Sequence, residues 1–116
     1  MKRQRAEQQG RKGEARAAAW LRLKGWSILD MRVKTPVGEV DIVAKRGALI
    51  AFVEVKWRSK VQDLDHAIDA YRLRRVAAAA EAIAHNYAKQ GEDLRVDVIL
   101  LAPKAFPRHI TNAWQP

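Results

Sequence analysis

The sequence lacks cysteine altogether, has only two serines and contains no long apolar run. Without cysteine the chain has no disulfide, no thiolate-ligated zinc or iron–sulfur site and no thiol nucleophile, which is typical of a protein from a reducing compartment. Neither Ser27 nor Ser59 lies in a nucleophile-elbow motif, so covalent hydrolase chemistry is not expected. The longest apolar run, Ala48–Val53, is far too short to cross a membrane, and no apolar stretch follows the basic N-terminus. We therefore expect no signal peptide, no membrane partner and a cytoplasmic location.

Positive charge is in clear excess. The 22 Lys and Arg side chains outnumber 13 Asp and Glu side chains, for a formal net charge of +9. The excess is uneven, since residues 1–34 carry +7 and residues 67–90 carry +2, whereas residues 35–66 and 91–116 are neutral. Such an excess on a small protein favours a polyanionic partner, nucleic acid before anionic lipid. A solvated surface that keeps the protein soluble is the alternative.

A chain of 116 residues supports one hydrophobic core, so we expect a single domain over residues 1–116. Ala-rich segments that end at glycine predict helices, and alternating or continuous apolar segments predict strands. In chain order, the pattern predicts a basic, partly mobile arm or frayed helix over residues 1–13, a helix over 14–24, strands over 26–33, 39–45 and 48–57, a helix over 66–90, a strand over 94–101 and a short strand within 108–114. This order favours an α/β fold in which helices flank a mixed central sheet.

Two neighbouring predicted strands carry charged side chains, which are almost never buried unless they are paired or bound to a ligand. Glu39 and Asp41 project from one face of their strand. Glu54 and Lys56 project from one face of the next strand, again about 6.7 Å apart along it. Apolar neighbours flank Glu54 and Lys56, which indicates a buried strand rather than an exposed edge.

The register of the hairpin decides whether the two charged pairs share a face. A two-residue turn at 46–47 would place Asp41 opposite Phe52 and Glu39 opposite Glu54, with all the charges together. A four-residue loop keeps this arrangement, whereas a three-residue loop would send Glu54 to the other face. The chemistry that these residues suggest requires the even-numbered loop.

Three carboxylates beside one ammonium would leave negative charge uncompensated, because like charges opposite one another in a sheet repel. A divalent cation would relieve this repulsion, and oxygen donors without a soft ligand favour Mg²⁺ or Mn²⁺ over zinc. Such an ion polarises a phosphodiester and activates a bound water, while Lys56 would orient that water or offset the developing charge. Glu14 lies on an otherwise inward-packing helical stripe and is expected to complete the metal shell. A structural cluster of ion pairs is the alternative.

Basic side chains are the expected nucleic-acid contacts. The first 16 residues contribute a dense basic run that is hard to explain by solubility alone. The expected contacts are Lys2, Arg3, Arg5, Arg11, Lys12, Arg16, Arg58, Arg72 and Arg75. For Arg72 and Arg75, which share a helix face, the solvated side of an Ala-rich helix is an equal alternative.

Several short motifs resemble those of a known family. Gly-Glu at 13–14, Gly-Glu-Val-Asp at 38–41 and Glu-Val-Lys at 54–56 are similar to motifs of the YraN-like family of small bacterial proteins, a branch of the PD-(D/E)xK nuclease superfamily. The likeness runs over nearly the whole chain, and the spacing also resembles archaeal Holliday-junction resolvases. Val40 stands where the superfamily name has proline, and Arg32 stands where many family members have asparagine.

The resemblance implies a restriction-endonuclease-like α-β-β-β-α-β core. It implies that Asp41 and Glu54 are metal ligands and that Lys56 is the catalytic lysine, with Glu14 and Glu39 as further acids of the catalytic site. We therefore expect a Mg²⁺- or Mn²⁺-dependent endonuclease that acts on DNA in preference to RNA, including branched or flap structures.

Two other classes stay open at this point: a non-catalytic nucleic-acid-binding module that retains the nuclease scaffold, and a protein-interaction domain whose charge is incidental. The sequence also leaves a homodimer open beside a monomer.

Overall fold

The computed structural model of the chain describes residues 2–60 and 69–114, with side chains from residue 11 onward. Its elements are α1 (Lys2–Leu23), β1 (Ser27–Thr35), β2 (Gly38–Arg46), β3 (Leu49–Trp57), α2 (Ala70–Tyr87), β4 (Asp93–Leu101) and β5 (Arg108–Ile110). The predicted order of helices and strands is confirmed, including the short last strand. No helix within the described residues is both long enough and apolar enough to span a membrane.

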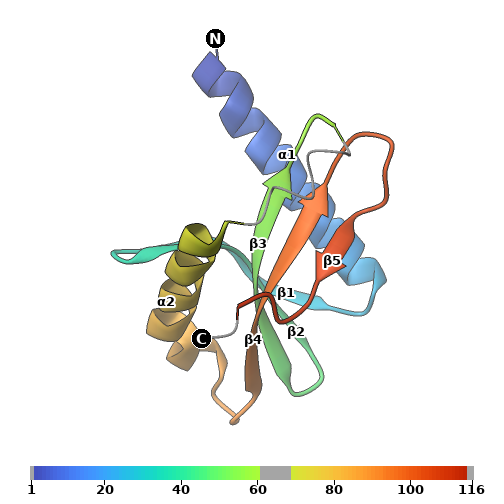
Figure 1. The fold of residues 1–116 in the computed structure, drawn as a ribbon. Coiled ribbons are helices and arrows are strands. Elements are labelled where there is room, and N and C mark those ends of the chain that lie inside the picture. Colours follow the sequence, from blue (N-terminus) through green and yellow to red (C-terminus); the bar gives the residue numbers. More distant parts are fainter. Residues whose placement is uncertain (1, 61–68, 115–116) are drawn as a thin grey trace.

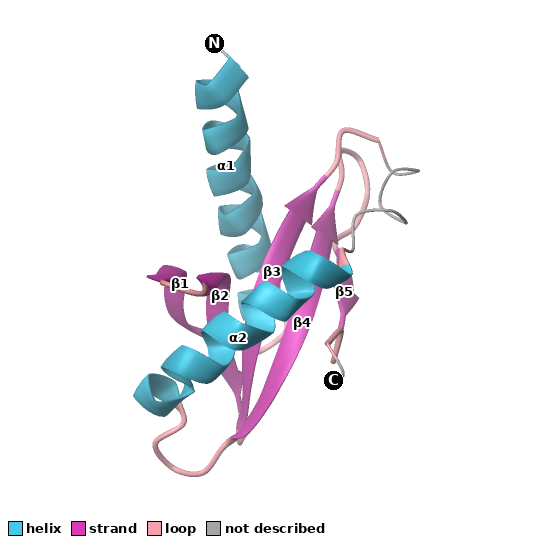
Figure 2. Ribbon diagram, turned by 60° about the vertical axis from the view of Figure 1, so that its left-hand side comes forward, coloured by secondary structure: helices cyan, strands magenta, loops and turns pink. Residues whose placement is uncertain are grey.

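The strands form one mixed sheet in the order β1-β2-β3-β4-β5. β1, β2 and β3 follow one another as an antiparallel meander, β4 pairs parallel to β3, and β5 pairs antiparallel to β4. A parallel pair needs a crossover connection, and α2 lies in the segment that joins β3 to β4. Figures 1 and 2 show the sheet between the two helices, with α2 across β3 and β4.

Each helix covers one face of the sheet and buries its own cluster of apolar residues. Ala17, Ala18 and Leu21 of α1 pack with Ile42 and Val53 of the sheet. On the opposite face, α2 packs against the next residues along the same strands; this cluster contains Val40, Val43, Ile50, Phe52, Val76, Ala79, Ala80 and Ile83. The period-2 alternation of β3 divides its side chains between the two helices. In β2 the alternation is broken beside Asp41, because Val40 packs with α2 and Ile42, two residues later, packs with α1.

The first helix is longer than predicted. α1 begins at Lys2, whereas the sequence predicted a helix from residue 14 and an arm or frayed helix before it. Residues 2–12 consist almost entirely of helix-favouring types, and the two internal glycines, Gly10 and Gly13, each cost only about 1 kcal/mol, so the helix continues through both. Figure 1 shows the N-terminal part of α1 projecting beyond the sheet. The side chains of Lys2, Arg3 and Arg5 lie outside the described residues.

The second helix is shorter than predicted at its C-terminal end. α2 begins at Ala70, and the Asp69 side chain caps it by accepting a hydrogen bond from the backbone N–H of Tyr71 at 2.9 Å. The predicted start at residue 66 lies outside the described residues. The helix ends at Tyr87 rather than at residue 90, because Ala88 leaves the helical conformation while its N–H still bonds to the Ala84 carbonyl.

The hairpin between β2 and β3 has an even-numbered loop, but its turn lies one residue later than predicted. Arg46 pairs with Leu49, so the two turn residues are Gly47 and Ala48. Gly47 has a φ of 61°, which suits glycine at the first position of a two-residue hairpin turn. The ladder runs to Ile42 opposite Val53, so the predicted pairs of Asp41 with Phe52 and of Glu39 with Glu54 are wrong. The paired ladder ends there, immediately before Asp41 and Glu54.

Candidate active site

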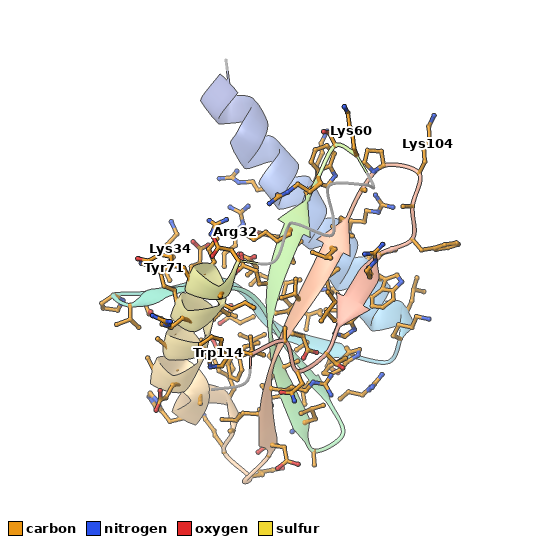
Figure 3. The ribbon with its side chains drawn as sticks, viewed as in Figure 1. Arg32, Lys34, Lys60, Tyr71, Lys104 and Trp114 are labelled. Carbon is orange, nitrogen blue, oxygen red and sulfur yellow. The ribbon has the colours of Figure 1, made fainter. Side chains whose placement is uncertain are left out.

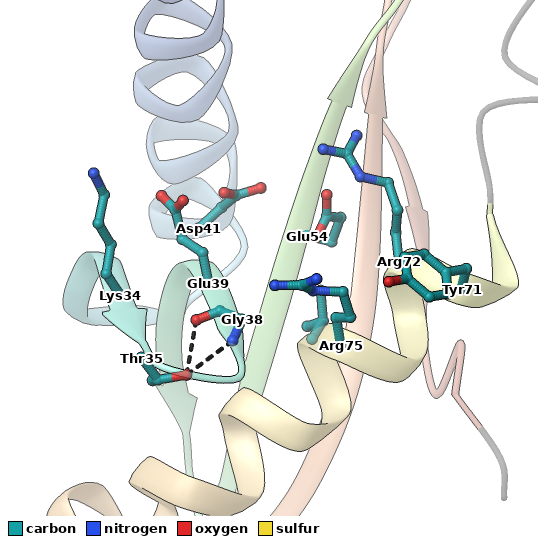
Figure 4. A pocket seen from close by; sticks show the side chains of 10 residues that line it. Lys34, Thr35, Gly38, Glu39, Asp41, Glu54, Tyr71, Arg72 and Arg75 are labelled. Carbon is teal, nitrogen blue, oxygen red and sulfur yellow. Dashed lines mark hydrogen bonds between the residues drawn. The ribbon is translucent and has the colours of Figure 1, made fainter.

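A cleft of about 530 Å³ lies between the ends of β2 and β3, the β1–β2 turn and the first turns of α2. Figure 4 shows Glu39 and Asp41 of β2 and Glu54 of β3 facing this space, with Arg72 and Arg75 reaching towards it from α2. The lining residues are Lys34, Thr35, Gly38, Glu39, Asp41, Glu54, Tyr71, Arg72, Arg75 and Val76. The structure therefore brings five of the predicted site residues into one cleft.

Asp41 occupies the point where the β2–β3 ladder ends. Its Oδ2 accepts a hydrogen bond from the backbone N–H of Val55 at 2.8 Å, so the carboxylate takes the place of a strand partner. Burial, followed by the nearby charge of Glu54, raises the pKa of Asp41 to about 7. The hydrogen bond from the Val55 N–H lowers this pKa and only partly opposes the rise. The charges of Glu14 and Glu39 raise the pKa further. Three neighbouring acids thus act on Asp41.

Glu54 has a protein counter-ion, whereas Asp41 has none among the described residues. The Nζ of Lys56 lies 2.9 Å from the Oε1 of Glu54, and both side chains are largely buried. They share a face of β3 because they are two residues apart, as the sequence predicted. Lys56 therefore offsets the charge of Glu54, whereas Asp41 is a partly buried carboxylate without a counter-ion among the described residues.

Glu14 reaches the site from α1 on the other side of the sheet. Its carboxylate forms an ion pair with the Nε of Arg32 on β1 and is largely buried. Since Glu14 also raises the pKa of Asp41, the two acids lie close enough to repel one another. The predicted convergence of Glu14 with the strand carboxylates is consistent with this arrangement, but the partner Arg32 was not predicted.

Gly38 sets how closely α2 approaches the cleft. A Cβ built at Gly38 would lie 2.5 Å from the backbone carbonyl oxygen of Arg75. Any side chain there would push α2 away from β2, and with it Arg72 and Arg75. The turn before Gly38 is held by Thr35, whose hydroxyl donates to the Gly38 carbonyl at 2.8 Å and accepts from the Gly38 N–H at 3.1 Å (Figure 4).

The other predicted nucleic-acid contacts lie outside the cleft lining. Arg11 and Lys12 are exposed on α1. Arg16 donates from Nη2 to the Ala105 carbonyl at 3.0 Å and so joins α1 to the loop after β4. Arg58 donates to the Trp57 carbonyl at 2.9 Å at the end of β3.

Two cleft residues were missed in the sequence. Lys34 lies in the last part of β1 and Tyr71 in the first turn of α2, and both line the cleft with their side chains exposed (Figure 3). Lys34 belongs to the basic N-terminal third, so the charge distribution contained a signal for it. Tyr71 precedes Arg72 on the helix, but only the packing of α2 on the sheet places it at the edge of the cleft.

A second polar cluster lies away from the cleft, where β4 meets β5. Asp97 is fully buried and accepts hydrogen bonds from Arg95 at 2.8 and 2.9 Å and from the Asn112 N–H at 2.9 Å. The Nε2 of His109 lies 2.8 Å from its Oδ2. Burial alone would raise the pKa of Asp97, but the hydrogen bonds from His109, Arg95 and Asn112 lower it. This cluster fixes β5 to β4, and the sequence pattern assigned no role to it.

The donor set of the cleft fits a hard cation in its chemistry. Asp41 and Glu54 offer carboxylate oxygens, and the excess negative charge on Asp41 is what a cation would relieve. Within the described part of the chain, no three His, Asp or Glu side chains are close enough together to hold a cation unaided. This is compatible with Mg²⁺, which commonly takes one or two protein carboxylates and completes its shell with water and phosphate.

Comparison with known proteins places the chain in a family. Residues 13–101 match the uncharacterised protein family UPF0102. The chain belongs to this family. A UPF0102 protein from Erythrobacter litoralis is 75% identical over 116 residues, and one from Sphingopyxis alaskensis is 59% identical over 116 residues; each match covers 100% of both chains. UPF0102 is the YraN-like family whose motifs the sequence resembles, so that prediction is confirmed.

A solved structure shares the fold. The chain is similar to Archaeoglobus fulgidus Hjc, a Holliday junction resolvase from an archaeal hyperthermophile, with a TM-score of 0.59 and 20% sequence identity. The match covers 84% of this chain and 72% of that chain. At this identity the likeness establishes the fold alone. It confirms the predicted α/β class with a restriction-endonuclease-like core for this UPF0102 protein.

Proposed function

We propose that the protein is a divalent-cation-dependent endonuclease that hydrolyses phosphodiester bonds in DNA, including branched or flap structures. The observation that carries this proposal is the environment of Asp41. Its carboxylate is partly buried near Glu54, and the pKa of Asp41 is raised to about 7. Burying a charge without compensation costs stability, and strongly perturbed carboxylates in clefts are typical of functional sites. The fold likeness to a Holliday junction resolvase supports the same conclusion.

Asp41 and Glu54 are the residues that would hold the cation, which we propose to be Mg²⁺ or Mn²⁺ because the donors are carboxylates. When bound, such an ion polarises the phosphodiester and lowers the pKa of a coordinated water. The ammonium of Lys56, 2.9 Å from Glu54, would orient the attacking water or offset negative charge that develops on the phosphate. Glu14 and Glu39 are the further acids of this catalytic site.

The basic residues around the cleft would hold the DNA backbone. Lys34, Arg72 and Arg75 line the cleft itself, and none of them forms an ion pair with another described residue. Arg11 and Lys12 extend the positive charge along the exposed side of α1. Lys and Arg that neutralise phosphates make binding strongly dependent on salt. The proposal places the protein in the cytoplasm, with access to DNA.

Cleavage assays test the proposal directly. The purified protein is incubated with single-stranded, duplex, flap and four-way-junction DNA, and with RNA of the same sequences, in chelator, Mg²⁺ or Mn²⁺. We expect cation-dependent cleavage of DNA that falls by about 100-fold or more in Asp41→Asn and Glu54→Gln, the scale of losing one group that stabilises the transition state.

Asp93→Asn and Glu81→Gln make the same chemical changes at exposed positions on β4 and α2, and they should cleave at the wild-type rate. Cleavage at the wild-type rate in Asp41→Asn and Glu54→Gln would reveal a contaminating nuclease and refute the proposal.

A non-catalytic nucleic-acid-binding module is the second candidate. The observation in its favour is that protein cations already compensate two of the acids, Glu14 through Arg32 and Glu54 through Lys56. Salt-sensitive DNA binding with no cleavage in any cation, unchanged in Lys56→Ala, would support this candidate over the endonuclease. Failure to bind any nucleic acid at low salt would exclude both and favour a protein-interaction domain. Gel filtration of the same samples would distinguish a monomer from a homodimer.

A further inference from the structure

Arg32 has an unusual backbone conformation for its place in a strand. Its φ is 56°, in the left-handed region that residues other than glycine and asparagine rarely adopt. The β1–β2 ladder passes from Met31 opposite Ile42 to Val33 opposite Val40, so the residue across from Arg32 is Asp41. Strained backbone of this kind persists only where its surroundings hold it, and it is concentrated at functional sites.

The strained backbone directs the Arg32 side chain to Glu14. The Nε of Arg32 forms an ion pair with the Oε2 of Glu14, a contact between strand β1 and helix α1. The Glu14 side chain is 11% exposed, whereas the Arg32 side chain is 38% exposed. The Arg32 side chain is therefore partly accessible to solvent, while the carboxylate that it neutralises is largely buried.

Glu14 is also one of the acids whose charge raises the pKa of Asp41. A cation held by Asp41 would attract Glu14, and the positive charge of Arg32 would repel that cation. The same carboxylate thus faces two competing positive partners, one from the chain and one from solution. The metal ion gains Glu14 as a partner only if the ion pair between Glu14 and Arg32 is broken, and breaking it costs free energy.

We propose that Arg32 is a positioning residue that competes with the divalent cation for Glu14 and leaves that carboxylate when a DNA phosphate binds. This inference rests on the proposed endonuclease function. The exposed side of the guanidinium can receive a phosphate, for which arginine has suitable bidentate geometry. Release of Glu14 then lets the site hold the cation more tightly. By linkage, bound DNA then raises the affinity for the cation, and bound cation raises the affinity for DNA by the same factor.

Titration of Mn²⁺ into the metal-free protein, followed by calorimetry and by the electron paramagnetic resonance signal of free Mn²⁺, tests the competition without any cleavage. We expect Arg32→Asn, which also suits the left-handed backbone, to bind Mn²⁺ about fivefold to tenfold more tightly than wild type, within the usual range of coupling between sites. Arg32→Lys keeps the charge and should remain close to wild type. Lys104→Asn removes a positive charge at an exposed residue outside the cleft lining that also has a left-handed backbone, with a φ of 59°, and it should change the affinity less than twofold.

A double variant and a DNA titration isolate the role of Glu14. Adding Glu14→Gln to Arg32→Asn should remove the gain in Mn²⁺ affinity. A four-way junction with phosphorothioate linkages should raise the Mn²⁺ affinity of the wild type more than that of Arg32→Asn. Equal Mn²⁺ affinity in wild type and Arg32→Asn, or a gain that survives Glu14→Gln, would overturn the inference and leave the endonuclease proposal standing. Absence of Mn²⁺ binding in every protein, with or without DNA, would refute both.

Discussion

Neutralising Asp41 should stabilise the metal-free protein. The folded state raises the pKa of Asp41 from 3.8 to about 7, through burial first and then the charge of Glu54. The folded protein therefore binds a proton that the unfolded chain has lost, and its stability falls as the pH rises through this range. Asp41→Asn removes this effect, while the amide oxygen can still accept the hydrogen bond from the Val55 N–H.

The size of the effect follows from the shift of the pKa. Between pH 5 and pH 8 the wild type should lose about 2 to 3 kcal/mol of unfolding free energy through Asp41, at about 1.4 kcal/mol for each pH unit below the folded pKa. The stability advantage of Asp41→Asn over wild type should grow by the same amount over that interval. Urea unfolding in chelator, monitored by tryptophan fluorescence at several pH values, measures this difference.

Asp93→Asn is the matched control, because Asp93 is exposed at the start of β4 and its substitution makes the same chemical change away from the cleft. Its stability relative to wild type should not depend on pH between 5 and 8. A structural ion-pair cluster predicts the opposite result for Asp41, namely that Asp41→Asn destabilises the protein and does so more strongly as the pH rises. That outcome would refute the idea that Asp41 lacks compensation in the absence of a cation.

Three further predictions concern packing, acid stability and DNA binding. Gly38→Ala should lower the free energy of unfolding in urea by about 1 to 3 kcal/mol, because its Cβ would meet the Arg75 carbonyl at 2.5 Å. Gly13→Ala is the control: its Cβ would meet its nearest atom at 3.6 Å, so it should raise the free energy of unfolding by up to about 1 kcal/mol through helix propensity. Asp97→Asn should lower the free energy of unfolding by about 3 kcal/mol at neutral pH. Because folding lowers the pKa of Asp97, the difference from wild type should shrink as the pH falls below about 4. A difference that does not change with pH would contradict the argument. Alanine at both Arg72 and Arg75 should weaken DNA binding and reduce the slope of log affinity against log salt by about 0.9 for each lost phosphate contact, and an unchanged slope would assign both to the solvated helix face.

Much of the candidate site follows from local rules of chain geometry. Successive side chains of a strand alternate between faces, so the spacing of Glu54 and Lys56 was enough to place them together. The hairpin loop is even-numbered as the chemistry requires, although the turn itself lies at Gly47 and Ala48, and Asp41 and Glu54 line the same cleft just beyond the paired residues. The position of the turn depends on which residue adopts a positive φ, and the sequence offered glycine at 47 without deciding its place in the turn.

The extent of α1 is a case in which local propensity was underestimated. Residues 2–12 favour helix on composition, but Gly10 and Gly13 suggested an interruption that the structure does not have. A Cβ at Gly13 would meet Leu101 at 3.6 Å and Trp57 at 3.9 Å, which are ordinary contact distances, so the packing of α1 on the sheet does not require a glycine there.

By itself, the sequence determined the order of elements and the alternation of β3, and it proposed the carboxylates of the candidate site, because each of these depends on neighbours within a few residues. Only the tertiary structure decided the faces of β2, whose alternation breaks between Val40 and Ile42. Only the tertiary structure decided that Arg32 meets Glu14 and that α2 rests on Gly38. Only the tertiary structure joined Asp97 to His109 across β4 and β5. Each of these contacts joins elements that are distant in the chain, so its existence depends on how helices and strands pack rather than on any local pattern of residues.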